Sequence, residues 1–172
     1  MEPVESRLLG VFYMNPMGQF HIRQIGRETG LDTKTVMKHL KNFARKGIVF
    51  RKKEKNSFPF YEANRHSALF RYGKTHALLE KIYESGLIGH LEKELEPKAI
   101  VLFGSVRKGT YHEKSDIDIF VQAKKRKMDL PYYEKKLKHR ISLFFEESPQ
   151  QLSRGLLQNI YNGIVLSGEL EL

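Results

Sequence analysis

Two aspartates are the residues of this chain best suited to chemistry. Asp116 and Asp118 flank Ile117 in an apolar run, residues 116–122, whose β-branched and aromatic side chains predict a buried strand. Residues two apart point to the same side of a strand, so both carboxylates share one face. Two carboxylates so placed repel each other and are partly removed from water, and both effects are unfavourable unless a cation compensates the charges. The spacing predicts a site for a divalent cation such as Mg²⁺.

A second predicted strand, residues 99–103, ends at a glycine-serine pair. Gly104 allows the backbone to turn and to approach a ligand closely, and Ser105 offers a hydroxyl and an amide to phosphate oxygens. Lys114 and Ser115 directly precede the aspartates, so we place them at the rim of the same cleft. Together these residues predict metal-dependent chemistry on a phosphate compound.

The segment AIVLFGSVRKGTYHEKSDIDIFVQ, residues 99–122, resembles the nucleotidyltransferase superfamily of DNA polymerase beta, and within it the minimal nucleotidyltransferases of prokaryotes. The matching residues, in chain order, are Gly104, Ser105, Gly109, Ser115, Asp116 and Asp118. The later run IYNGIVLSGEL, residues 160–170, is similar to the closing segment of such domains. The resemblance covers about the last 75 residues.

This resemblance implies an enzyme that transfers a nucleoside monophosphate from a nucleoside triphosphate, with ATP the expected one, to a hydroxyl acceptor. It implies that Asp116 and Asp118 are catalytic and hold two Mg²⁺ ions, with Mn²⁺ as the alternative metal. It implies that Ser105 holds the triphosphate. The residues expected to bind the nucleotide are Gly104, Ser105, Lys114 and Ser115.

The chain departs from the family at a third carboxylate, which usually lies on the next strand and helps to bind metal and to accept the proton of the attacking hydroxyl. Here that strand is predicted at residues 139–145, and the expected position holds Ser142. A serine is neither a general base near neutral pH nor a charged metal ligand. Glu146, Glu147 and Asp129 are more remote acids. The sequence leaves three alternatives open: an acid reaches in from elsewhere, the enzyme tolerates the loss, or the site binds nucleotide without turnover.

Positive charge is concentrated near the N-terminus. The 172 residues carry a formal net charge of +10, and residues 1–66 contain 13 basic and 6 acidic side chains. The apolar spacing predicts helices at residues 4–14, 21–29 and 32–46, followed by a β-hairpin of residues 48–53 and 58–62. Three helices and a basic hairpin make a winged helix-turn-helix.

The segment HIRQIGRETGLDTKTVMKHLKNFARKGIV, residues 21–49, resembles that DNA-binding family in the style of prokaryotic transcriptional regulators. The resemblance implies that residues 32–46 form the recognition helix and that the hairpin contacts phosphates. The residues expected to bind DNA are Thr33, Lys34, Thr35, Lys38, His39, Arg51, Lys52, Lys53 and Lys55. The alternative is a winged helix used for protein contact or for dimerisation.

The sequence therefore predicts an α+β protein with three parts: a winged helix-turn-helix at residues 1–65, a helical connector at 66–96 and a minimal nucleotidyltransferase domain at 97–172. The connector has an apolar stripe, broken at Ser85-Gly86, that packs on a domain or mediates a homodimer. The last part is expected to hold a small mixed sheet of strands 98–103, 116–122 and 139–145, a helix at 130–138, and helices after Pro149.

The chain has no cysteine and no apolar run of membrane-spanning length, so we expect a cytoplasmic protein without a membrane partner. Two functions of different class remain. The first is a nucleotidyltransferase delivered to nucleic acid or a partner by the winged helix. The second is a DNA-binding transcriptional regulator whose nucleotidyltransferase fold is degenerate. A third, implied by the resemblance, is an antitoxin-like subunit that acts on a partner protein.

Overall fold

The computed structural model describes residues 3–171. The chain divides into two compact units, one up to Ala77 and one from Leu78 onward. The division falls inside a long helix, α4 (Ala68–Ser85), and therefore inside the segment expected to connect the domains. Phe70 and Ala77 of this helix pack into the N-terminal core, whereas Leu78 and Ile82 pack into the C-terminal core. Each half of the helix thus belongs to a different unit.

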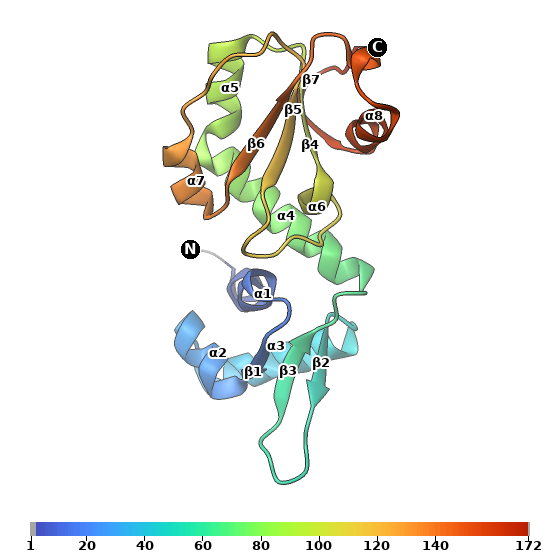
Figure 1. Ribbon diagram of the computed structural model, residues 1–172. Helices are drawn as coiled ribbons and strands as arrows, with labels where there is room; N and C mark the ends of the chain where they lie inside the picture. The colour runs from blue at the N-terminus through green and yellow to red at the C-terminus, as the bar shows by residue number, and fades with distance from the viewer. Residues whose placement is uncertain (1–2, 172) are drawn as a thin grey trace. The chain divides into compact units, whose positions relative to one another are not determined.

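The N-terminal unit contains three helices and a three-stranded antiparallel sheet (Figure 1). Its elements are α1 (Val4–Met14), β1 (Gln19–His21), α2 (Ile22–Thr29), α3 (Thr33–Arg45), β2 (Val49–Lys52) and β3 (Phe60–Ala63). The strand order is β1-β3-β2. Figure 1 shows the loop that joins β2 and β3 extending away from the three helices of this unit. We call β2, β3 and this loop the hairpin.

Local sequence signals set these elements. Gly30, in the left-handed conformation with φ 65°, ends α2, and the Asp32 side chain caps α3 by accepting a hydrogen bond from the Thr35 amide at 2.9 Å. The apolar faces of the helices meet in one core, in which Leu8, Ile25 and Leu40 are fully buried. The helices and the hairpin lie where the periodicity predicts them. Strand β1 is an additional element, since its three residues pair only with β3.

The C-terminal unit is built on a four-stranded mixed sheet. Its elements after α4 are α5 (Leu87–Leu95), β4 (Ala99–Phe103), α6 (Gly104–Arg107), β5 (Ile117–Val121), α7 (Pro131–Leu137), β6 (Ile141–Phe145), the 3-10 turn η1 (Pro149–Gln151), α8 (Arg154–Tyr161) and β7 (Ile164–Gly168). The strand order is β6-β5-β4-β7, with β4 antiparallel to both neighbours and β5 parallel to β6.

Helices cover both faces of this sheet. The end of α4 and α5 pack on one face, against side chains such as Ile117 and Ile119, while α8 packs on the other through Ile160, near Phe103 and Phe120 (Figure 1). Because side chains alternate along β5, Asp118 points to the α8 side of the sheet. The sequence-predicted strands and connecting helix are present. The strand β7, which was not among the strands expected, forms from the segment that resembles the closing part of the family.

Among residues 3–171, no helix combines the length and the apolar character that crossing a bilayer requires.

Candidate active site

The glycine-serine turn lies directly against the aspartate pair, by which we mean Asp116 and Asp118. Strand β4 ends at Phe103, which is the antiparallel partner of Asp118, and Gly104 follows with φ 70°. A Cβ atom on Gly104 would lie 2.1 Å from the Asp118 Oδ2 atom. The position therefore excludes a side chain twice, through its backbone conformation and through the space that the carboxylate occupies. Ser105 is the next residue, in the single turn of α6.

The aspartate pair is an electrostatically strained arrangement. Asp118 lies within β5, and Asp116 directly precedes that strand. The pKa of Asp118 is raised above its ordinary value, first by burial and second by the negative charge of Asp116. The shared face predicted from the sequence is consistent with this interaction. Because burial and like charge both oppose ionisation of Asp118, a bound cation would relieve both, and oxygen donors of this kind fit Mg²⁺.

Ser142 lies beside the pair, at the position where the sequence resemblance predicts a third acid. It is the parallel partner of Asp118 in the β5–β6 ladder, and its hydroxyl donates a hydrogen bond to Asp116 Oδ2 at 3.2 Å. The strand register thus puts a neutral hydroxyl at the position of the expected carboxylate. A hydroxyl donor supports the charge on Asp116 but adds no charge to a metal site.

Other acids do not complete the pair. The Glu146 amide donates to the Val121 carbonyl at 3.4 Å, at the far end of β5 from Asp116, and the Glu146 carboxylate accepts from the Ser148 amide at 3.1 Å. Within residues 3–171 there is no group of three or more His, Cys, Asp or Glu side chains placed to hold a metal ion. The residues that could hold Mg²⁺ are therefore the aspartate pair, with the remaining coordination left to substrate and water.

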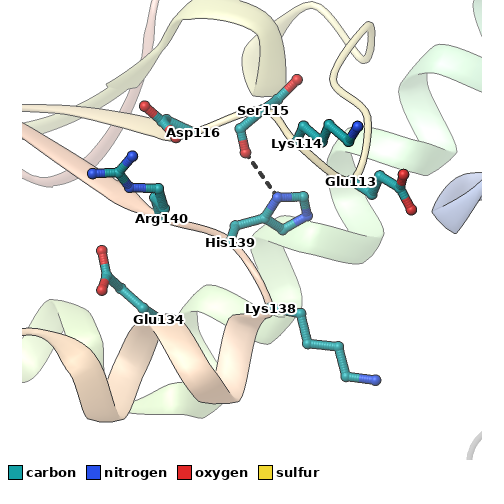
Figure 2. Close-up of a pocket in the computed structure, with 8 residues that line it drawn as sticks. All are labelled: Glu113, Lys114, Ser115, Asp116, Glu134, Lys138, His139 and Arg140. Carbon is teal, nitrogen blue, oxygen red and sulfur yellow. Dashed lines mark hydrogen bonds between the residues drawn. The ribbon is translucent and has the colours of Figure 1, made fainter.

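A pocket with a volume of about 420 Å³ opens next to Asp116 (Figure 2). We call it the Asp116 pocket. Its lining residues are Glu113, Lys114, Ser115, Asp116, Glu134, Lys138, His139 and Arg140. It lies at the edge where the parallel strands β5 and β6 begin, beside the end of α7. In the view of Figure 2, the Arg140 side chain lies between those of Asp116 and Glu134.

Two lining side chains of this pocket are held in place by hydrogen bonds. The Nδ1 atom of His139 lies 2.9 Å from the Ser115 carbonyl oxygen, and the ring packs edge-on against Tyr111. A carbonyl oxygen only accepts, so Nδ1 carries the hydrogen, and in the neutral ring Nε2 carries the lone pair. The Glu134 Oε1 atom accepts from the Ile141 amide at 2.9 Å. The pocket that Asp116 lines therefore also contains two groups that can accept a proton, Glu134 and His139.

The structure distributes the predicted nucleotide-binding residues between two places. Gly104 and Ser105 lie at the turn against Asp118, whereas Lys114 and Ser115 line the Asp116 pocket. The Ser115 hydroxyl accepts a hydrogen bond from the His112 amide at 3.0 Å, which closes the turn before β5. Ser115 thus has a structural contact that the sequence did not reveal.

Sequence reasoning missed the pocket residues that come from α7 and the start of β6, namely Glu134, Lys138, His139 and Arg140. A signal for two of them was present. His139 and Arg140 directly precede β6, as Asp116 directly precedes β5, and a helix joins the two strands. A strand-helix-strand connection favours parallel pairing, which brings the starts of both strands to one edge.

In the N-terminal unit, some of the predicted DNA-binding side chains contact other residues of the chain, and the others are exposed to solvent. Thr35 donates its hydroxyl to the Asp32 carboxylate at 2.6 Å, and His39 Nδ1 lies 3.4 Å from Glu5 Oε1. Lys52 pairs with Glu62 across the hairpin and lowers the pKa of that carboxyl. The remaining predicted residues are exposed: Thr33, Lys34, Lys38, Arg51, Lys53 and Lys55.

Comparison with known proteins adds one match. Residues 85–154 match the family described as the nucleotidyltransferase domain. The match begins at the end of α4 and includes β4, Gly104-Ser105, the aspartate pair, α7 and β6. No curated protein and no solved structure matches the chain.

Proposed function

We propose that the C-terminal unit transfers a nucleoside monophosphate from a nucleoside triphosphate, with ATP the expected donor, to a hydroxyl acceptor. The match of residues 85–154 to the nucleotidyltransferase domain family supports this proposal. One observation supports this most strongly. A Cβ atom on Gly104 would collide with the Asp118 carboxylate, and the charged form of Asp118 is disfavoured first by burial and second by the charge of Asp116, which raise its pKa. A turn able to approach phosphate and a carboxylate pair in need of a cation therefore adjoin each other.

Asp116 and Asp118 would hold Mg²⁺ or Mn²⁺. When bound, such an ion neutralises the phosphate charge and lowers the pKa of the attacking hydroxyl. The fit rests on the oxygen donors of the pair and on the burial and like-charge repulsion that together raise the pKa of Asp118. Ser105, adjacent to Gly104, is assigned to the triphosphate oxygens.

The reaction requires the acceptor oxygen to attack the α-phosphorus. A new oxygen–phosphorus bond forms, the bond from the α-phosphorus to the bridging oxygen breaks, and pyrophosphate leaves. The hydroxyl proton must go to a base, and Ser142 cannot take it. Asp116 is the residue common to the aspartate pair and the pocket. We therefore assign the acceptor hydroxyl to the Asp116 pocket, where Glu134 and His139 Nε2 can accept the proton.

We further propose that the N-terminal unit is a winged helix that binds DNA. The support is its three helices followed by a hairpin, together with the exposed cations of α3 and the hairpin. Residues 1–66 carry seven more basic than acidic side chains, which favours a polyanionic partner.

A second function, a DNA-binding regulator with an inactive nucleotidyltransferase fold, is favoured by one observation. Ser142 occupies the position next to Asp118, and its hydroxyl bonds to Asp116 in place of a third carboxylate. In that case the aspartate pair would bind Mg²⁺ and nucleotide as a signal without transfer.

The decisive experiment incubates the full chain with labelled nucleoside triphosphates and Mg²⁺, with and without cell extract. Label is scored on protein, nucleic acid and small molecules. The matched control is the Asp116→Ala/Asp118→Ala variant. Transfer that disappears in the control supports the enzyme, and label on one extract protein supports the antitoxin-like function. No transfer by the folded wild type contradicts the enzyme and favours the regulator.

A further inference from the structure

The hairpin presents an aromatic ring to solvent. Phe58 is 84% exposed, and no other large apolar side chain among residues 3–171 is as exposed. Phe60, two residues further along the hairpin, is buried and packs edge-on against His21. A single exposed apolar side chain is common on protein surfaces, so the pocket that Phe58 lines is the observation that points to a ligand.

Phe58 forms one wall of a mainly apolar pocket with a volume of about 300 Å³. We call it the Phe58 pocket. Its lining residues are His21, Ile22, Arg23, Thr33, Phe58 and Pro59. They come from the end of β1, the first residues of α2 and α3, and the hairpin, all within the N-terminal unit. His21 Nδ1 lies 3.1 Å from the Pro59 carbonyl oxygen, which ties the hairpin to the start of α2.

The polar groups of this pocket suit hydrogen bonding to a planar ligand. The His21 Nδ1 atom must carry the hydrogen, since the Pro59 carbonyl only accepts, so in the neutral ring Nε2 is the acceptor. Arg23 and Thr33 are exposed and supply donors. A volume at the small end of ligand pockets fits one planar ring system better than an extended ligand.

The charge around the pocket indicates a polyanion. The hairpin carries exposed Arg51, Lys53 and Lys55, and Lys34 lies next to Thr33 at the start of α3. An aromatic platform bordered by cations is the arrangement that binds unpaired nucleotides, because bases stack on the ring while phosphates contact the cations. The faces of bases inside a duplex are already stacked, so a duplex offers nothing to Phe58.

We propose that the N-terminal unit binds single-stranded DNA, with an unpaired base in the Phe58 pocket stacked on the Phe58 ring. This inference rests on the proposed binding of DNA and names the form of DNA that is bound. The phosphates that flank the base lie along Arg23, Lys53 and Lys55.

The test measures fluorescence anisotropy of the full chain with labelled oligonucleotides of one sequence, as single-stranded DNA, duplex DNA and single-stranded RNA. The variants are Phe58→Ala and Phe58→Tyr. Phe50→Ala is the matched control, because Phe50 is 46% exposed on the same hairpin but does not line the pocket. Neither alanine substitution removes a buried side chain, so both variants should fold, and circular dichroism checks this.

We expect wild type to prefer single-stranded DNA over the duplex. Phe58→Ala should weaken single-strand binding by roughly tenfold or more, as the loss of one stacked base implies. Phe58→Tyr should retain the affinity, and Phe50→Ala should change it by less than Phe58→Ala does.

Three outcomes overturn the inference. Tighter binding of the duplex, with no effect of Phe58→Ala, leaves the proposed DNA binding intact but removes the stacked base. Tighter binding of RNA contradicts the assignment to DNA. No binding of any oligonucleotide contradicts the DNA-binding function itself, and the inference falls with it.

Discussion

The two units concentrate charge in opposite ways. In the C-terminal unit, Asp118 lies within the buried strand β5 and Asp116 directly precedes it, and burial together with like-charge repulsion raises the pKa of Asp118. In the N-terminal unit, the cations of the hairpin are exposed to water, and Lys52 has a compensating partner in Glu62. The negative charge of Asp118 therefore lowers the stability of the fold when no cation is bound. The positive charges of the hairpin have little effect on stability. Substitutions at the aspartate pair should consequently change both stability and ligand binding, whereas substitutions at the hairpin should change DNA binding alone.

The largest contrast is expected from Asp118→Asn. Transfer should fall by at least about a thousandfold, since metal binding supplies several kcal/mol of transition-state stabilisation. Stability should nevertheless rise by about 1 kcal/mol, as is common when a strained functional group is removed. Activity and thermal melting, measured on the same preparation, check both. An Asp118→Asn variant that is less stable than wild type and still active would contradict the proposal that Asp118 lowers stability and is required for transfer.

The same residue predicts a pH dependence. Because the folded pKa of Asp118 is raised, the folded state binds more protons than the unfolded state between the ordinary aspartate pKa and the raised value. The contribution of Asp118 to stability therefore falls as the pH rises through that window and stays unfavourable at neutral pH. The difference in melting temperature between wild type and Asp118→Asn should shrink as the pH is lowered through the window. Added Mg²⁺ should raise the melting temperature of wild type only.

Gly104→Ala should have the next largest effect. The alanine would have to adopt the left-handed backbone conformation of Gly104, and its Cβ atom would lie 2.1 Å from Asp118 Oδ2. We therefore expect a loss of about 1–3 kcal/mol in stability and weaker nucleotide binding. Gly89→Ala is the matched control, because Gly89 lies in α5 with nothing within 4 Å of an added Cβ. Denaturant unfolding of both variants measures the difference. Equal stability of the two would show that the turn does not depend on Asp118.

Ser142→Asp tests whether Ser142 occupies the position of a third metal-binding carboxylate. A carboxylate there would lie in register with Asp118 and beside Asp116, so it should lower stability without metal and raise Mg²⁺ affinity by about tenfold, through one added charged ligand. Titration of Mg²⁺ by calorimetry measures the affinity, with Ser142→Asn as the uncharged control. An unchanged affinity would mean that Ser142 does not occupy the metal-binding position.

The smallest effects are expected at the hairpin. Lys53→Ala should lower the salt dependence of DNA affinity by about one unit of slope, whereas Lys52→Ala should lower it less because Glu62 already pairs with Lys52. Both should leave stability within about 0.5 kcal/mol of wild type. Affinity across a salt series gives the slopes. Equal slopes for all three proteins would place the phosphate contacts elsewhere.

Much of the site could be predicted from local sequence. Alternation along one strand places Asp116 and Asp118 together, and the glycine-serine pair marks the turn that the structure packs on Asp118. The position of Ser142 also followed from the predicted strand, and the register agrees with it. These features depend on residues close together in the chain.

The rest depends on pairing between distant segments. Strand β1 has only three residues, too few to show an alternating pattern, and is defined by its pairing with β3. Strand β7 pairs with β4, far away in the sequence. Glu134 and His139 line the same pocket as Asp116 because β5 and β6 pair in parallel, which brings the starts of both strands to one edge. Ser115 illustrates the remaining difficulty, since its hydroxyl closes a turn that no spacing rule predicts.

The central claim is that Asp116 and Asp118 form a metal-dependent nucleotide site. Calorimetric titration of the full chain with ATP, with and without Mg²⁺, tests it most directly when repeated with the Asp116→Ala/Asp118→Ala variant. We predict that wild type binds ATP only with Mg²⁺ and that the folded variant does not bind it. Equal binding by wild type and variant, or binding by wild type that is indifferent to Mg²⁺, would contradict the account.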